Sequence, residues 1–173
     1  YVIARHRAQA GALQGGVVGT VMSNFGLERA LEACGIPFSR ASVGDRYVLE
    51  LLKERGWTLG GESSGHILCL DLATTGDAIV AALQALVPMV EGARSLTELA
   101  GGMQKLPQVM INVRSDDPRA RAADARVQAA AASASARLAG RGRVLLRPSG
   151  TEPVVRVMVE GESESEVRGI AEE

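Results

Sequence analysis

The sequence predicts an α/β fold in two parts, a three-layer α/β domain followed by a small α+β domain. Strand-like β-branched runs alternate with amphipathic helix-like stretches as far as residue 103, an order typical of α/β domains. After residue 105 the order becomes strand, helix, strand, strand, helix, which indicates a separate α+β domain. Apolar residues make up 46% of the 173 residues, enough to bury a real core.

The expected boundaries divide the chain into three segments. Residues 17–104 are predicted to form the first domain and residues 105–173 the second, while residues 1–16 form a linker helix or the end of a preceding domain. The chain begins without Met and stops inside a helix-like run. We therefore expect a piece of a longer protein, with the second domain truncated at its C-terminus.

The elements of the first domain follow from apolar patterning and capping residues. Strands are predicted at residues 17–22 and 38–41 and on both sides of a glycine-rich loop at 60–66. Helices are predicted after Asn24 and Asp45, because both side chains are good N-caps. A third helix is predicted within residues 74–92, where one stripe at helical spacing contains Ile79, Ala82, Leu83, Leu86, Val87 and Val90.

The second domain has its own pattern. Alternating apolar residues predict a strand at 109–113, and Asp117-Pro118 is a cap followed by a first-turn proline. The Ala-rich residues 119–139 are predicted to form an exposed helix that ends at Gly140, because Ala is the best helix former. The remaining elements are strands at 143–147 and 154–160 and a helix from Glu164.

The loop "RPSGTEP" connects the last two strands and is rich in hydrogen-bond donors. Arg147, Ser149, Thr151 and the amides around Gly150 suit an anion, and Arg156 lies a few residues along the next strand, where it can reach the same anion. Together these groups suit a phosphate dianion. Ser, Gly, Thr and Pro are also ordinary turn residues, so a polar hairpin stays open as an alternative.

The loop "GGESSGH" carries the second group of candidates. Glu62 can accept hydrogen bonds, Ser63 and Ser64 can donate and accept, and His66 closes the loop. Neighbouring sugar hydroxyls require this chemistry, although a solvated turn is the simpler interpretation of the loop alone. In "VGDRYV", Arg46 is either a surface charge or a phosphate contact.

Composition argues against several partners. Lys and Arg total 19 and Asp and Glu 20, and aromatic residues are 3%, so neither charge nor base stacking favours nucleic acid. No apolar run approaches the roughly 20 residues of a membrane span, and these residues lack the basic-then-apolar pattern expected of a signal peptide. Cys34 and Cys69 lack zinc-site spacing, so we expect two buried free thiols in a cytoplasmic protein.

Five motifs in order resemble the α-D-phosphohexomutase superfamily: "GGVVGTVMSN", "VGDRYVLE", "GGESSGHI", "TTGDAIVAALQ" and "RPSGTEPVVRVMVEG". The resemblance covers almost the whole chain, and it is to the third and fourth domains of these four-domain enzymes. Ser63 and Gly150 favour a resemblance to the glucosamine branch. The related mannose and glucose phosphate enzymes usually carry Met at the position of Ser63 and often Asn at the position of Gly150.

The resemblance implies an isomerase that converts glucosamine 6-phosphate to glucosamine 1-phosphate for peptidoglycan precursors. It implies a phosphoserine, a glucosamine 1,6-bisphosphate intermediate and Mg²⁺, whose serine and metal loops belong to domains without a counterpart here. It also leaves room for a homodimer of the longer protein. The alternatives are a mutase for mannose or glucose phosphates, and a sugar-phosphate binding module without catalysis.

The resemblance also assigns roles to the candidate residues. It implies that the loop with Glu62 and Ser64 binds the sugar hydroxyls. It also implies that the group of residues with Arg147 and Arg156 binds the non-reacting phosphate. Arg46 falls where the superfamily places a basic residue near the reacting phosphate, and we favour charge stabilisation because a guanidinium seldom loses its proton. No other catalytic residue and no metal ligand is expected in these residues.

Overall fold

The computed structural model describes all residues from Tyr1 to Glu173, which form two compact units, Tyr1–Lys105 (unit 1) and Leu106–Glu173 (unit 2). Unit 1 is an α/β domain and unit 2 an α+β domain, so the predicted fold class is confirmed. Unit 1 contains α1 (Val2–Gln9), β1 (Val17–Thr20), α2 (Phe25–Glu32), β2 (Phe38–Ala41), α3 (Asp45–Arg55), β3 (Leu59–Gly61), β4 (Ile67–Cys69), α4 (Ala78–Gly92) and α5 (Leu96–Ala100).

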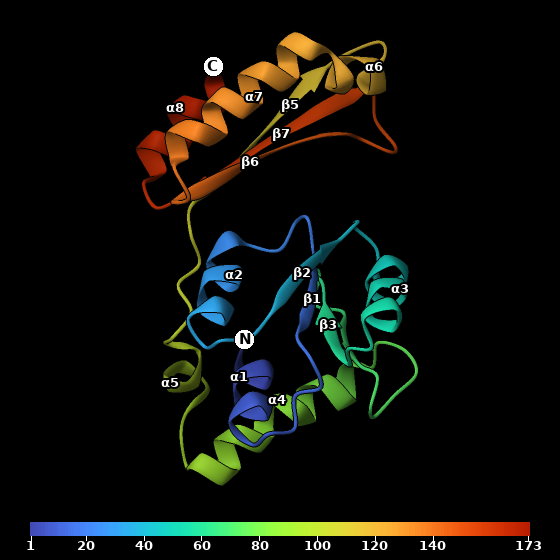
Figure 1. Cartoon of the computed structure of the whole chain (residues 1–173), viewed down its shortest axis with the longest axis vertical. Coiled ribbons are helices and arrows are strands. Elements are labelled where there is room, and N and C mark those ends of the chain that lie inside the picture. The colour runs from blue at the N-terminus through green and yellow to red at the C-terminus, as the bar shows by residue number, and fades with distance from the viewer. The chain divides into compact units, whose positions relative to one another are not determined.

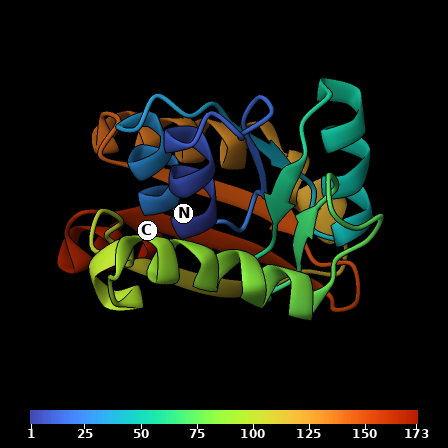
Figure 2. The same cartoon turned by 90° about the horizontal axis from the view of Figure 1, so that it is seen from below.

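The sheet of unit 1 has the strand order β2-β1-β3-β4, in which β1 pairs parallel with β2 and β3, and β4 is antiparallel to β3. Helix α3 covers one face, and α1 and α2 lie on the other (Figures 1 and 2). Residues of α4 pack into the same core as α1 and α2. From β1 the chain runs through α2 to β2 at one edge of the sheet, and from β3 it turns to β4 at the other edge. The loops after β1 and β3 therefore flank a crevice at the carboxyl ends of these strands, the usual place for a ligand.

Two local predictions for unit 1 are corrected by the structure. Asp45 does not cap α3: the N-cap is Gly44, at φ 128°, and the Asp45 carboxylate accepts only the Arg46 N–H. Asp45 instead lies in the first turn, where its charge complements the helix dipole. The short helix α5 was not predicted, although Ser95 and Glu98 form a capping box at its start. The predicted cap at Asn24 is confirmed.

The apolar stripe on α4 faces outward. Ile79 and Val90 are 74% and 80% exposed, and Leu83 and Leu86 lie between them on the same face. The helix residues that are buried are Ala81 and Pro88. Periodicity found the stripe, but the other face of the helix, with Val80, Ala81 and Ala85, makes the contact with the core. The thiols also differ from expectation, because Cys69 is buried while Cys34 is exposed.

Unit 2 is a three-stranded antiparallel sheet covered by helices on one face (Figure 1). Its elements are β5 (Gln108–Arg114), α6 (Pro118–Ala123), α7 (Ala125–Leu138), β6 (Gly142–Pro148), β7 (Val154–Gly161) and α8 (Glu164–Glu172), with the strand order β5-β7-β6. Leu138, Val159 and Val167 are fully buried where α7 and α8 pack on the sheet. The other face carries the polar residues of all three strands.

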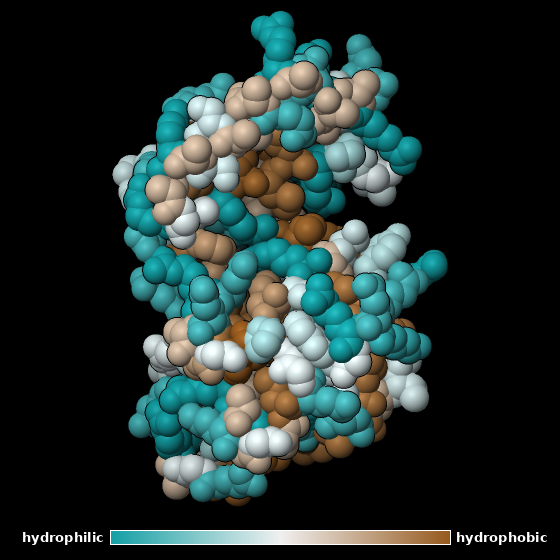
Figure 3. Space-filling model, in the orientation of Figure 1, coloured by the Kyte–Doolittle hydropathy of each residue, from teal (hydrophilic) through white to brown (hydrophobic).

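The Ala-rich segment forms two helices, not the single helix predicted. Asp124 interrupts it with extended backbone and caps α7 by accepting the N–H groups of Arg126 and Val127. The predicted cap of α6 at Asp117 is confirmed. Because Ala side chains are short, a cavity of about 700 Å³ remains between α7, α8 and the sheet. Figure 3 shows its apolar side chains as a brown area beside α7.

Candidate functional site

Unit 1 has a pocket of about 310 Å³ that extends along β1 and β3 to the loops that follow them. Its wall is largely apolar, formed by Tyr1, Ile3, Leu27, Leu59, Ile67 and Met103. Polar residues come from the loops after the two strands, Ser23 and Asn24 after β1 and Glu62 and Ser63 after β3. An apolar cleft with a few convergent polar groups is the usual form of a small-molecule site.

Glu62 joins two loops at this pocket. Its Oε1 accepts the Gly44 N–H at 2.8 Å, so the carboxylate sits at the N-terminus of α3, where negative charge is favoured. The Glu62 N–H donates to the His66 carbonyl at 2.9 Å, and the turn closes at Gly65, whose φ of 102° favours glycine. One carboxylate oxygen is thus engaged and the other is available to accept from a ligand.

The structure separates the predicted residues of this loop. Ser63 lines the pocket beside Glu62, whereas Ser64 and His66 do not. The latter two are exposed and contact each other, with Ser64 Oγ 3.4 Å from His66 Nδ1. Two of the four side chains, Glu62 and Ser63, therefore lie at the pocket. The other two lie on the outer surface of the loop.

Arg46 is an exposed residue of α3. Its Nε donates to Glu50 Oε1 at 2.9 Å, one helical turn away, and this contact raises the pKa of the guanidinium above its ordinary value. The Arg46 side chain is 79% exposed. Arg46 thus has the geometry of a surface ion pair and does not line the pocket of unit 1.

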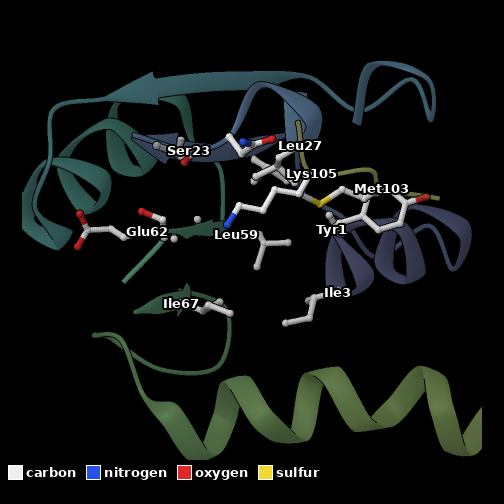
Figure 4. Close-up of a pocket in the computed structure, with 17 residues that line it drawn as sticks. Tyr1, Ile3, Ser23, Leu27, Leu59, Glu62, Ile67, Met103 and Lys105 are labelled. Atoms are coloured by element: carbon white, nitrogen blue, oxygen red, sulfur yellow. The ribbon is translucent and has the colours of Figure 1, made fainter. Parts of the chain in front are cut away.

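Lys105, a pocket residue that sequence reasoning missed, reaches into the site from the end of unit 1. In Figure 4, its side chain runs from beside Met103 toward Glu62, with the ammonium nitrogen on the Glu62 side. It makes no ion pair and no hydrogen bond within the chain. No motif marks this lysine, so only the structure identifies it.

Unit 2 places the two predicted arginines side by side. In the ladder between β6 and β7, Arg147 is directly opposite Arg156, so both side chains project from the same face. The sequence predicted that Arg156 reaches the loop, and the register shows that it lies next to the loop's own arginine. The "RPSGTEP" turn begins just after Arg147.

The paired arginines lack partners for part of their guanidinium groups. The Nε atoms of both Arg147 and Arg156 are shielded from solvent and have no hydrogen-bond partner. Burial, and then the neighbouring Arg156 charge, lower the pKa of Arg147 below its ordinary value. Arg156 has one ion pair, from its Nη2 to Glu152 Oε2 at 2.7 Å. Two cations in register are unfavourable, and an anion placed between them would relieve this repulsion.

The loop beside these arginines is held by its own serine. Ser149 Oγ accepts the N–H groups of Thr151 and Glu152 at 3.4 and 3.3 Å, both long contacts. Gly150 has no positive φ, and a Cβ built there would meet nothing within 4 Å. The protein's own packing therefore does not require this glycine, and open space lies next to the loop backbone.

Comparison with known families follows the division into units. The model "Phosphoglucomutase/phosphomannomutase, alpha/beta/alpha domain III" matches residues 1–106, and "Phosphoglucomutase/phosphomannomutase, C-terminal domain" matches residues 110–173. The chain belongs to this family. The loop "GGESSGH" thus lies in the family's domain III, and the loop "RPSGTEP" in its C-terminal domain.

Curated relatives within the family are named phosphoglucosamine mutase. The chain is 58% identical over 172 residues to that of Aeromonas hydrophila subsp. hydrophila, covering 99% of this chain and 39% of the relative. It is 60% identical over 174 residues to that of Erwinia tasmaniensis, covering 99% of this chain and 38% of the relative. The chain thus spans about two fifths of the length of the curated relatives it matches.

Solved structures confirm the fold. Aspergillus fumigatus N-acetylphosphoglucosamine mutase in complex with GlcNAc-6P and magnesium matches with a TM-score of 0.78 at 21% identity, over 99% of this chain and 43% of that one. A variant of the same fungal enzyme in complex with glucose 1,6-bisphosphate matches with a TM-score of 0.76 at 23% identity, over 99% and 40%. At these identities the likeness shows the fold alone.

Neither metal-binding nor membrane-spanning features are found in the chain. No group of three or more His, Cys, Asp or Glu side chains is arranged to hold a metal ion. None of the helices is both long enough and apolar enough to cross a bilayer.

Proposed function

We propose that this chain is the C-terminal part of a phosphoglucosamine mutase that interconverts glucosamine 6-phosphate and glucosamine 1-phosphate. The observation that carries the proposal is the 58–60% identity, along 99% of the chain, to bacterial enzymes of that name. Because those enzymes are more than twice as long, the activity belongs to the longer protein. The proposed setting is the cytoplasm of a bacterium, where the product supplies peptidoglycan precursors.

The proposed reaction consists of two phosphoryl transfers, each of a different phosphoryl group. A phosphoserine outside these residues gives its phosphoryl group to the sugar's C1 hydroxyl, so that the serine O–P bond breaks as the sugar O–P bond forms. The resulting glucosamine 1,6-bisphosphate reorients and returns its other phosphoryl group to the serine. One phosphate must be held while the other reacts, and positioning of this kind can supply a large part of the barrier reduction.

Unit 2 is proposed to hold the non-reacting phosphate. Arg147 and Arg156 would share its oxygens through charge-assisted hydrogen bonds, and Ser149, Gly150 and Thr151 would contribute loop donors. The solvent-shielded Nε atoms without partners support this role, because buried polar groups are normally satisfied. The open space beside Gly150 leaves room for the anion.

Unit 1 is proposed to bind the sugar hydroxyls. Glu62 has an available carboxylate oxygen, Ser63 lies beside it, and Ser64 and His66 form the outer part of the same loop. Arg46 is proposed to stabilise the reacting phosphate, which requires its guanidinium to exchange Glu50 for the substrate. In this proposal the loop of unit 1 contacts the sugar and the loop of unit 2 contacts a phosphate group.

Magnesium is expected for the family, since one structural neighbour was solved with it. The side chains of this chain do not fit a magnesium site, because no acidic group is suitably arranged. Its ligands would therefore belong to the part of the protein outside these residues. A glucose 1,6-bisphosphate complex of another neighbour is consistent with a bisphosphate intermediate.

The test is turnover by the protein encoded by the complete coding sequence. Glucosamine 6-phosphate, mannose 6-phosphate and glucose 6-phosphate are compared as substrates at equal concentration. We expect the highest kcat/KM with glucosamine 6-phosphate. A preference for either of the other sugars would reject the glucosamine assignment, and binding without turnover would favour a non-catalytic module.

A further inference from the structure

Asn112 lies beside the paired arginines, near the C-terminal end of β5. The ladder pairs Asn112 with Arg156, and Arg156 with Arg147. The three side chains therefore form a row across the sheet, on the face opposite α7 and α8. Neighbours in such a row have Cβ atoms about 4.5–5.5 Å apart, so Asn112 is within reach of a ligand bound at Arg156.

The fold itself does not account for this asparagine. Asn is depleted in strands, yet it stands here between Ile111 and Val113 in a seven-residue strand. Its side chain is exposed and makes no hydrogen bond within the chain. A residue that opposes local preference without a compensating contact indicates a functional position.

The amide has a different chemistry from its neighbours in the row. Arg147 and Arg156 only donate hydrogen bonds, which suits phosphate oxygens that only accept. Asn112 can donate and accept at once, which suits a hydroxyl group. It also lies on β5, next to the β6–β7 pair that carries the two cations, so a group attached to a phosphate at Arg156 is within its reach.

We propose that Asn112 is a sugar-contacting residue of unit 2, which hydrogen-bonds a hydroxyl of the phosphosugar whose phosphate lies on Arg147 and Arg156. The proposal rests on the anion site proposed above and adds a contact with the sugar in the same unit. Asn112 therefore distinguishes a phosphosugar from free phosphate. Without it, unit 2 would bind both ligands through the phosphate alone.

The experiment compares two ligands on the 173-residue chain by isothermal titration calorimetry or NMR titration. Inorganic phosphate probes the anion site alone. Glucosamine 6-phosphate also probes the sugar contacts, of which the Asn112 variants change only the one in unit 2. Asn112→Ala is expected to weaken glucosamine 6-phosphate binding about fivefold, as for the loss of one neutral hydrogen bond, and to leave phosphate binding unchanged. Gln108→Ala, on the same face of β5 but opposite Glu160, is the matched control and should change neither.

A second variant tests the position of the side chain. Asn112→Asp keeps the size of the residue but places a carboxylate beside Arg156, so it should weaken phosphate and glucosamine 6-phosphate alike. Thermal unfolding of each variant shows that the sheet is intact, which is expected because Asn112 is exposed.

The outcomes separate the two proposals. If Asn112→Ala weakens both ligands equally, or neither, Asn112 does not contact the sugar, while the anion site stands as long as the wild-type chain binds phosphate. Phosphate binding by Asn112→Asp as tight as by the wild type also overturns the placement of Asn112. If the wild-type chain binds neither ligand, the anion site itself is wrong, and Asn112 loses its role with it.

Discussion

The loops of the two units differ in how far the protein satisfies their polar groups. In unit 1, the Glu62 carboxylate already accepts the Gly44 N–H, and Ser64 contacts His66. In unit 2, Arg147 stands opposite a second arginine, and both Nε atoms lack partners. The loop of unit 1 can hold its shape without a ligand, whereas the cations of unit 2 remain electrostatically unfavourable until an anion binds.

The same contrast exists within a single strand of unit 2. Arg143 and Arg147 lie four residues apart on β6 and project from the same face. Arg143 is opposite Glu160, with Nε 2.6 Å from an oxygen of that fully buried carboxylate, while Arg147 is opposite Arg156. Arg143 thus neutralises a buried carboxylate, whereas Arg147 faces a second cation. Substitutions of Arg143 and Arg147 test this difference directly, and substitutions of Glu62 and Ala139 should have smaller effects.

Arg143→Ala should have the largest effect, on stability. It removes the ion-pair partner of Glu160, and losing one member of a buried pair costs about 3–5 kcal/mol. The free energy of unfolding is measured by urea denaturation. Arg141→Ala is the control, because its pair with Glu166 lies at the surface and should contribute little to stability. Equal losses in the two variants would contradict the structural role of Arg143.

Arg147→Ala should act on binding and not on stability. Removing a charge-assisted phosphate contact costs about 1.5–3 kcal/mol, or roughly a 10- to 100-fold loss of phosphate affinity. The free energy of unfolding should stay constant or rise, because the repulsion with Arg156 disappears. Calorimetric titration and urea unfolding on the same samples measure both. Unchanged affinity with reduced stability would show that Arg147 is structural.

Substitutions of Glu62 test the loop of unit 1. Glu62→Ala loses the contact to the Gly44 N–H and should lower the free energy of unfolding by about 1 kcal/mol. Glu62→Gln keeps an oxygen acceptor for that N–H, so it should cost less than half as much. In the complete enzyme both variants should raise KM for glucosamine 6-phosphate. Retention of the wild-type KM in both variants would limit Glu62 to its role at α3.

The smallest effect concerns backbone strain at the end of α7. Ala139 has φ 47°, in the left-handed region that glycine adopts without penalty. Ala139→Gly should therefore raise the free energy of unfolding by about 0.5–1 kcal/mol. Ala136→Gly, inside the same helix, should lower it by a similar amount. Thermal melts of the two variants should shift in opposite directions, and shifts of the same sign would contradict the strain at Ala139.

Sequence predicted best those features that local chemistry decides. Asn24 and Asp117 cap their helices as expected, because a cap depends on residues within one turn. Strand alternation also placed Arg156 on the correct face of β7, which is the face that carries its ladder neighbour Arg147. The prediction that Asp45 caps α3 was wrong. Gly44 takes the cap position with a positive φ, and its N–H donates to Glu62, which is distant in sequence.

Features that depend on contacts distant in sequence could not be predicted. The alternation in β7 does not reveal that Arg156 pairs with Arg147 and Asn112, since strand order and register set this. The apolar stripe of α4 has the right period, but periodicity does not tell which side of the helix meets the core. Lys105 enters its pocket through the path of the chain after α5, for which no sequence signal exists.

The most direct test of the central contrast is an NMR titration of the arginine Nε–H resonances of the 173-residue chain with phosphate. The Arg147 and Arg156 signals should shift strongly and together, because their Nε–H groups have no partner without the anion. The Arg143 signal should stay nearly constant, because Glu160 already accepts from its Nε. If saturating phosphate moves Arg143 as much as Arg147, or leaves Arg147 and Arg156 unmoved, the anion site of unit 2 is contradicted.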